Sequence, residues 1–168
     1  MTAREQLLSF LAKAADPNSG GRQMPQHYGH KDLRIVSQSS PTGTQFLQAV
    51  GCAMVCKIEK TKEVVYVSAG EGTTSQGDFH EALNWSSREK APVIFHIQDN
   101  EYAISTHKSE QIAGSVFSLV SGYENLSRFQ IDGTSFFESH LAFKQAAERA
   151  RKGKGPSVIV SNVVRLMP

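Results

Sequence analysis

The stretch EVVYVSAGEGTTSQGDFHEALNWSSREKAPVIFHIQDN, residues 63–100, carries most of the information about the fold. Residues 63–70 form an apolar run that ends in glycine, which is typical of a buried strand entering a tight turn. Residues 77–90 have helical spacing, with Asp78 in the first turn. Residues 91–100 form a second apolar run and end in Asp-Asn. The order strand, helix, strand indicates a parallel pair joined by a crossover helix.

The rest of the chain continues this alternation. We expect helices at 3–15, 44–60, 110–121 and 135–152, and further strands at 127–133 and 156–164. The segment 17–44 is rich in Gly, Pro, Ser, His and Gln and predicts a long ordered loop. Because the strands are continuously apolar, we predict an α/β fold of three layers, with a mainly parallel sheet covered by helices on both faces. We expect one domain over residues 1–168.

Composition excludes several classes of function. The formal net charge of +2 is too small to indicate a nucleic acid or an anionic membrane as the partner. No apolar run approaches the roughly 18 residues of a membrane span. Cys52 and Cys56 are spaced for one helix face, which favours neither a disulfide nor a zinc site. We therefore expect buried thiols in a reducing compartment and a cytoplasmic protein.

Two polar groups stand where buried strands end. Gly70-Glu71-Gly72 and Asp99-Asn100 fall at the carboxyl ends of strands, where ligands of parallel sheets bind. A glycine turn exposes N–H groups that suit a phosphate, yet the carboxylate of Glu71 would repel one. A divalent cation such as Mg²⁺ between them removes the conflict. The residues therefore allow a metal–diphosphate site built from Glu71, Gly72, Thr73 and Asn100, or simply a tight turn with a solvated Glu71.

Other interpretations of the glycine cluster are weaker. The segment GEGTTSQG, residues 70–77, does not match G-x-G-x-x-G and lacks the Gly-Lys-Ser/Thr of a nucleotide-triphosphate loop. A nicotinamide-binding domain is therefore disfavoured.

Several motifs together resemble one family. The spacing from Glu71 to Asn100, 100 − 71 = 29 positions, resembles the thiamine-diphosphate motif. The segments GDFHEALNW (77–85), NEYAIST (100–106), GGRQMPQHYG (20–29) and SQSSPTGTQFLQAVG (37–51) resemble the α-type subunit of 2-oxo acid dehydrogenases, the decarboxylating component of their complexes. The resemblance implies the thiamine-diphosphate-binding fold. It speaks against a transketolase, another thiamine-diphosphate class, whose motifs differ at 77–84 and 39–45.

The resemblance implies a role for each matching residue. Glu71 and Asn100 would bind Mg²⁺ through their side chains and Tyr102 through its carbonyl, while Gly72 and Thr73 would offer N–H groups to the diphosphate. Ser40 and Thr42 would lie beside the aminopyrimidine of the cofactor. A structural K⁺, present in some members, would fall to Ser39, Pro41, Thr44 and Gln45.

The sequence departs from the family at three positions in and near these motifs. Glu71 stands where many pyruvate-type members have Asp, Asp99 where Asn is common, and Gln98 where some relatives have Arg. The last departure leaves the diphosphate charge less compensated within this chain.

The resemblance also implies an activity and partners. We expect decarboxylation of a 2-oxo acid, branched-chain or pyruvate, and transfer of the acyl group to a lipoyl arm on an acyltransferase. A β-type subunit or domain would supply the glutamate that activates the cofactor, so we expect an oligomer. No catalytic residue is expected within the chain: the active-site histidine should follow directly after Pro168, and a Tyr-Arg pair should precede Met1. We therefore expect a fragment, inactive alone, with a non-catalytic assembly module that pairs with a β-type partner as the alternative.

The histidines do not form a catalytic set. His96, in a buried strand, predicts a hydrogen-bonded core residue, and His140 predicts a surface position on a late helix. His80 and His107 are interpreted as packing and loop residues. His27 and His30 fall in the loop before residue 44, where either a functional or a structural role is open.

Overall fold

The computed structural model describes residues 1–167, which divide into two compact units, residues 1–42 and residues from 43 onward. The expectation of one domain over 1–168 stays a prediction. The histidine expected after Pro168 lies outside the described residues.

The first unit holds one helix and a long loop. Helix α1, Ala3–Phe10, begins with a reciprocal capping box in which the amide of Thr2 donates to the Glu5 carboxylate and the amide of Glu5 to the Thr2 hydroxyl. The predicted helix 3–15 is too long, because the chain turns left-handed at Ala12 with φ 48°. Residues 11–42 contain no helix or strand beyond one isolated bridge, His30 to Ile35, as the loop prediction required.

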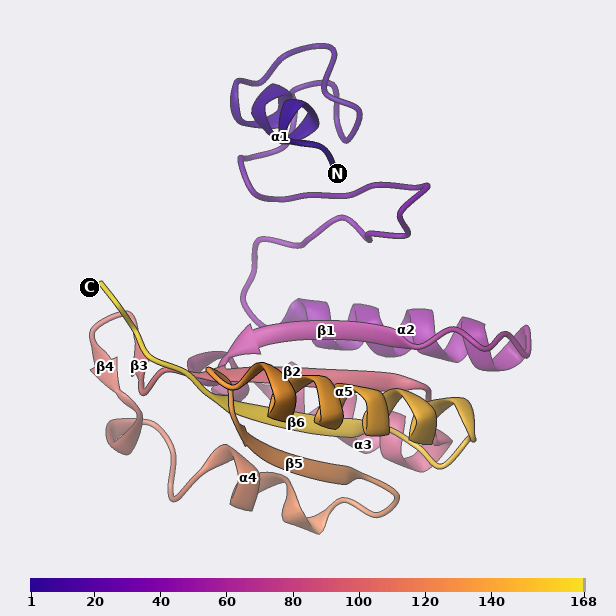
Figure 1. Ribbon diagram of the computed structural model, residues 1–168, viewed down its shortest axis with the longest axis vertical. Helices are drawn as coiled ribbons and strands as arrows, with labels where there is room; N and C mark the ends of the chain where they lie inside the picture. The colour runs from indigo at the N-terminus through magenta and orange to yellow at the C-terminus, as the bar shows by residue number, and fades with distance from the viewer. Residues whose placement is uncertain (168) are drawn as a thin grey trace. The chain divides into compact units, whose positions relative to one another are not determined.

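The second unit is built on one parallel sheet (Figure 1). Its strands are β1 Val65–Gly70, β2 Val93–Asp99, β5 Ser127–Asp132 and β6 Ser157–Asn162, in the order β1-β2-β6-β5 with every pair parallel. Its helices are α2 Thr44–Ile58, α3 Gly77–Glu89, α4 Val116–Leu119 and α5 Phe136–Arg151. These bounds lie within three residues of the predicted ones for all elements except α4.

Helices cover both faces of this sheet because its central strands, β2 and β6, are buried on both faces. Phe95 and Ile97 of β2 lie in a core with residues of α2, α3 and α4, whereas Ile94 of the same strand lies in a second core with α5. Successive strand residues point to opposite faces, so one strand serves both cores. The predicted three-layer α/β fold is confirmed.

His96 points to the α5 face of β2 and is held by hydrogen bonds on both ring nitrogens. Its Nδ1 lies 2.8 Å from the Tyr66 hydroxyl and its Nε2 2.9 Å from the Ser161 hydroxyl. The ring of Phe143 on α5 meets it edge-on at 5.0 Å between centroids. Burial lowers the pKa of His96 below its ordinary value. The predicted hydrogen bonds of this histidine are confirmed, but its ring is half-buried beside the core and not inside it.

Two local predictions fail between β2 and β5. The helix expected at 110–121 shrinks to α4, because Gly114 adopts φ 94° and Ser115 caps the helix start with its hydroxyl. The short antiparallel hairpin of β3, Tyr102–Ala103, and β4, Thr106–His107, was not predicted. Figure 1 shows this hairpin at the end of the sheet where β1 and β2 finish.

Among residues 1–167 no helix is long and apolar enough to cross a membrane. Cys52 and Cys56 are free and half-buried on α2, more exposed than predicted, because they lie toward the outer side of that helix.

Candidate metal and diphosphate site

The parallel register brings Glu71 and Asn100 together at the carboxyl ends of the strands. Strands β1 and β2 pair up to Gly70 and Gln98, so the residues that follow each strand leave the sheet side by side. The side chain of Glu71 then reaches across, and its Oε2 accepts a hydrogen bond of 3.3 Å from the backbone amide of Asn100. The predicted convergence of these two residues is therefore found.

Glu71 is the most deeply buried carboxylate among residues 1–167. It is only 1% exposed, and it begins the short 3₁₀ helix Glu71–Ser75 that links β1 to α3. Its Oε1 is buried and has no hydrogen-bond partner within the described residues. A buried acceptor without a donor is costly, and a cation is what best satisfies a carboxylate oxygen. The alternative of a solvated glutamate in a tight turn is wrong, because water does not reach this side chain.

The residues present suit a hard cation such as Mg²⁺. A carboxylate, an amide oxygen and backbone carbonyls are all oxygen donors, which is the set that Mg²⁺ prefers. In residues 1–167 no group of three or more His, Cys, Asp and Glu side chains is arranged to hold a metal, so a soft or transition-metal cluster has no counterpart in that part of the chain.

Two overlapping Asx turns shape the segment after β2. The carboxylate of Asp99 accepts from the amide of Glu101 at 3.0 Å, and the side-chain oxygen of Asn100 accepts from the amide of Tyr102 at 3.0 Å. Between them Glu101 takes a left-handed conformation with φ 71°, which is uncommon for a residue with a side chain. The turn places the backbone of Tyr102, a predicted metal ligand, two residues after Asn100.

Gly72 is required by a close approach of the hairpin. A Cβ atom at this position would lie 2.5 Å from the Cβ of Ala103 in β3. The 3₁₀ helix and the hairpin can therefore touch only because residue 72 has no side chain. The amides of Gly72 and Thr73, predicted to face a diphosphate, stand at the start of this 3₁₀ helix.

A lysine that the sequence did not single out lies beside this turn. Lys108, in the 3₁₀ helix Lys108–Glu110, forms ion pairs with Asp99 at 3.2 Å and with Glu101 at 3.1 Å. Burial pulls the pKa of Lys108 down, but hydrogen bonds to Glu101 and Asp99 together raise it above its ordinary value. The residue was missed because it becomes a neighbour of Asp99 only through the unpredicted hairpin.

The remaining predicted residues belong mainly to the first unit. Ser39, Ser40, Pro41 and Thr42 close that unit, while Thr44 and Gln45 begin α2 in the second. The hydroxyl of Ser40 lies 2.8 Å from Nε2 of His27, whose Nδ1 lies 3.1 Å from the Pro25 carbonyl. The aminopyrimidine contacts and the K⁺ site stay predictions.

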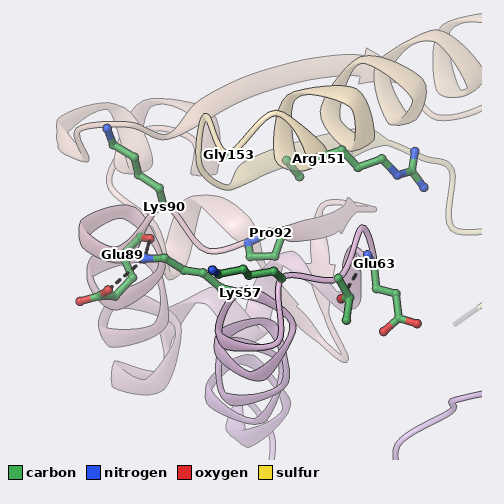
Figure 2. A pocket seen from close by; sticks show the side chains of 10 residues that line it. Lys57, Glu63, Glu89, Lys90, Pro92, Arg151 and Gly153 are labelled. Carbon is green, nitrogen blue, oxygen red and sulfur yellow. Dashed lines mark hydrogen bonds and ion pairs between the residues drawn. The ribbon is translucent and has the colours of Figure 1, made fainter.

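Two cavities lie at opposite ends of the second unit. The larger, about 580 Å³, adjoins the hairpin and the chain after β6, and is lined by Tyr102, Ile104, Ser105, Arg165, Leu166 and Met167. The smaller, about 290 Å³, is shown in Figure 2 and lies at the amino ends of the strands. There Lys57 bridges to the side chain of Glu89 at 3.2 Å, near the carboxyl ends of α2 and α3. Helix carboxyl ends carry partial negative charge, so the lysine is explained without a ligand.

Comparison with known proteins agrees with this geometry. The family of dehydrogenase E1 components matches the chain over residues 1–168. The α subunit of 2-oxoisovalerate dehydrogenase from Bacillus subtilis (strain 168) is 45% identical over 169 residues, covering 100% of this chain and 51% of that protein. The mitochondrial α subunit from Mus musculus is 37% identical over 151 residues, covering 90% of this chain and 34% of that protein. The chain thus spans about half the length, or less, of these relatives.

Two solved structures share the fold at low sequence identity. Transketolase from Campylobacter jejuni superposes with a TM-score of 0.69 at 19% identity, over 88% of this chain and 24% of that one. A protein from Mycobacterium smegmatis, described as a thiamin diphosphate-dependent enzyme without an established activity, gives a TM-score of 0.53 at 23% identity, over 71% of this chain and 22% of that one. The match over all of its residues and the motifs at the ends of β1 and β2 lead to one conclusion: the chain belongs to the dehydrogenase E1 component family.

Proposed function

We propose that the chain is the diphosphate-binding part of a branched-chain 2-oxo acid dehydrogenase E1 component. It binds thiamine diphosphate through Mg²⁺ and acts with a β-type partner to decarboxylate a 2-oxo acid and pass the acyl group to a lipoyl group. Family membership supports the reaction class, and the names of the similar α subunits favour 2-oxoisovalerate over pyruvate.

The observation that carries the proposal is that Oε1 of Glu71 is buried and has no hydrogen-bond partner among residues 1–167. An assembly module would need no such oxygen, since an uncompensated buried acceptor only destabilises a fold that binds nothing there. This favours metal binding over the alternative of a non-catalytic module.

Each residue at the edge of the sheet then has a task. Glu71 holds the cation with a buried charge, Asn100 adds a neutral oxygen, and the backbone of Tyr102 adds another. Gly72 and Thr73 present amides to the diphosphate. The bound cofactor supplies the electron sink for decarboxylation, and the chain supplies binding, orientation and charge.

Partners and setting extend the proposal. The similar proteins are α subunits of E1 components, so a β-type partner is proposed to complete the active site, and a lipoyl-bearing acyltransferase to receive the product. The free thiols Cys52 and Cys56 support a reducing compartment, and we propose the cytoplasm.

The decisive experiment is the substitution Glu71→Gln, which keeps the side-chain volume and removes the charge. Titration of thiamine diphosphate in the presence of Mg²⁺ should show saturable binding by the wild-type protein with its partner and none by the variant. Glu148→Gln, an exposed carboxylate on α5, is the control and should bind as the wild type does. Equal binding by Glu71→Gln and wild type would refute the proposal and leave the assembly module.

A second measurement compares the activity of the isolated chain with that of the complex. The chain alone, given 2-oxoisovalerate and a dye acceptor, should show no turnover, and turnover should appear when the β-type partner is added. Turnover by the isolated chain would show that no partner is needed.

A further inference from the structure

Lys108 joins two acidic side chains that stand on either side of Asn100. Its ammonium group lies 3.2 Å from Oδ2 of Asp99 and 3.1 Å from Oε1 of Glu101. Its backbone amide also donates to the carbonyl of Glu101 at 2.9 Å. The residue before Asn100 and the residue after it are thus held by the same lysine.

The bridge is buried at one end and exposed at the other. The side chain of Asp99 is 7% exposed, whereas that of Glu101 is 58% exposed. A buried carboxylate needs a cation nearby, and Lys108 is the cation that meets Asp99. Without it, Asp99 would have to move toward water and carry its turn with it.

Movement of Asp99 would be felt at the metal site through the backbone. The carboxylate of Asp99 accepts from the amide of Glu101, and the next Asx turn sets the side-chain oxygen of Asn100 against the amide of Tyr102. The amide of Asn100 itself donates to Glu71. Each proposed metal ligand is therefore tied to the turn that Lys108 holds at both ends.

We propose that Lys108 is a positioning residue for Asn100: by bridging Asp99 and Glu101 it fixes the turn that sets Asn100 against Glu71. The inference rests on the proposed function, because it assigns a role relative to the metal. It also explains why an acidic residue is tolerated at position 99 within a site for an anionic cofactor: Lys108 neutralises the charge of Asp99.

The test measures metal affinity rather than activity. Mn²⁺ can replace Mg²⁺ as the probe, and its binding in the presence of thiamine diphosphate is followed by electron paramagnetic resonance in the full-length protein with its β-type partner. Lys108→Met keeps the aliphatic stem and removes the charge. We expect Mn²⁺ to bind about tenfold more weakly, the usual cost of losing a group that orients a metal ligand.

Two further variants define the mechanism. Lys108→Arg keeps a cation between the carboxylates and should bind Mn²⁺ with nearly wild-type affinity. The double variant Asp99→Asn with Lys108→Met removes the buried charge together with its partner, and Asn at position 99 can still accept from the amide of Glu101. It should recover most of the affinity that Lys108→Met loses.

A matched control separates positioning from stability. Lys57→Met breaks another lysine–glutamate pair, at the amino ends of the strands (Figure 2). It should lower the melting temperature and leave Mn²⁺ affinity unchanged. If Lys108→Met does not fold, Glu101→Gln, which removes the negative charge from the exposed arm of the bridge, should still weaken Mn²⁺ binding.

The outcomes distinguish a failure of the proposed function from a failure of the role assigned to Lys108. If the wild-type protein shows no metal-dependent cofactor binding, the proposed function fails and this inference fails with it. If the wild type binds but Lys108→Met or Glu101→Gln binds equally well, only the role of Lys108 is refuted. A double variant that binds no better than Lys108→Met also refutes it.

Discussion

The backbone amide of Asn100 donates a hydrogen bond of 3.3 Å to Oε2 of Glu71, a residue 29 positions earlier in the chain. This bond uses one oxygen of the carboxylate and leaves Oε1 buried and without a partner among the described residues. It also ties the ends of β1 and β2 together, so the two residues proposed to bind the metal form part of one rigid edge.

Replacement of Asn100 by alanine should affect both binding and stability. The change removes a proposed metal oxygen and the acceptor for the amide of Tyr102. We expect loss of Mg²⁺-dependent cofactor binding in calorimetric titrations, and a decrease of about 1 kcal/mol in the free energy of unfolding. Asn84→Ala, at an exposed position of α3, is the control. Cofactor affinity that stays at the wild-type value would contradict the role of Asn100.

Replacement of Gly72 by alanine should destabilise the protein by overpacking. The new methyl group would meet the Cβ of Ala103 at 2.5 Å, so the 3₁₀ helix and the hairpin must separate. We expect a loss of about 1–3 kcal/mol in chemical denaturation, and recovery in the double variant with Ala103→Gly.

The control variant should change the free energy of unfolding in the opposite direction. A methyl group at Gly51 in α2 would meet no neighbouring atom within 4 Å, so Gly51→Ala should stabilise the helix by about 0.5–1 kcal/mol. A Gly72→Ala protein as stable as the wild type would show that the hairpin can shift freely.

The stability of the fold should depend on pH through His96. Burial keeps the pKa of His96 below the ordinary value of 6.5, so the unfolded chain takes up a proton that the folded protein resists. The free energy of unfolding should therefore fall as the pH drops below about 6.5. His96→Gln should flatten this dependence in denaturation curves between pH 7 and 5. An identical slope in both proteins would be inconsistent with a half-buried, neutral imidazole.

The aromatic cluster around Phe46 should contribute strongly to the stability of the larger core. Its ring lies 5.0 Å from that of Phe79 and 6.1 Å from that of Phe95, between α2, α3 and β2. Phe46→Ala should cost about 3–5 kcal/mol by denaturant titration. Phe137→Ala, with a side chain that is 83% exposed on α5, should change stability by less than about 0.5 kcal/mol. A small loss for Phe46→Ala would mean that the core collapses around the cavity.

Sequence patterns were sufficient for the sheet and its covering helices. The continuous apolar runs of β2 and β6 and the helical spacing of α3 and α5 are local signals that survive in the folded chain, and the edge where Glu71 and Asn100 meet follows from parallel pairing alone. The predictions fail where the structure of a segment depends on tertiary contacts. The β3–β4 hairpin has only two residues in each strand, too few to leave a period, and it exists because Gly72 lets it approach the 3₁₀ helix.

The same hairpin explains why Lys108 was overlooked. In the sequence it is a lysine in a polar loop, nine positions after Asp99. Only the reversal of the chain between Tyr102 and His107 returns it to the end of β2. Likewise, helix α1 stops early because backbone hydrogen bonds fold residues 11–13 back onto its last turn. The spacing of apolar side chains gives no signal for such a turn.

The strand order has a consequence for how the protein is made. Strand β6 lies between β2 and β5, yet a ribosome delivers it last of the four. Until it emerges, β2 is paired on one side only and β5 has no neighbour in the sheet, so a nascent chain displays one unpaired edge of β2 and both edges of β5. Folding of the second unit can finish only after translation has passed Asn162, and the interval before that point is when the chain most needs a chaperone.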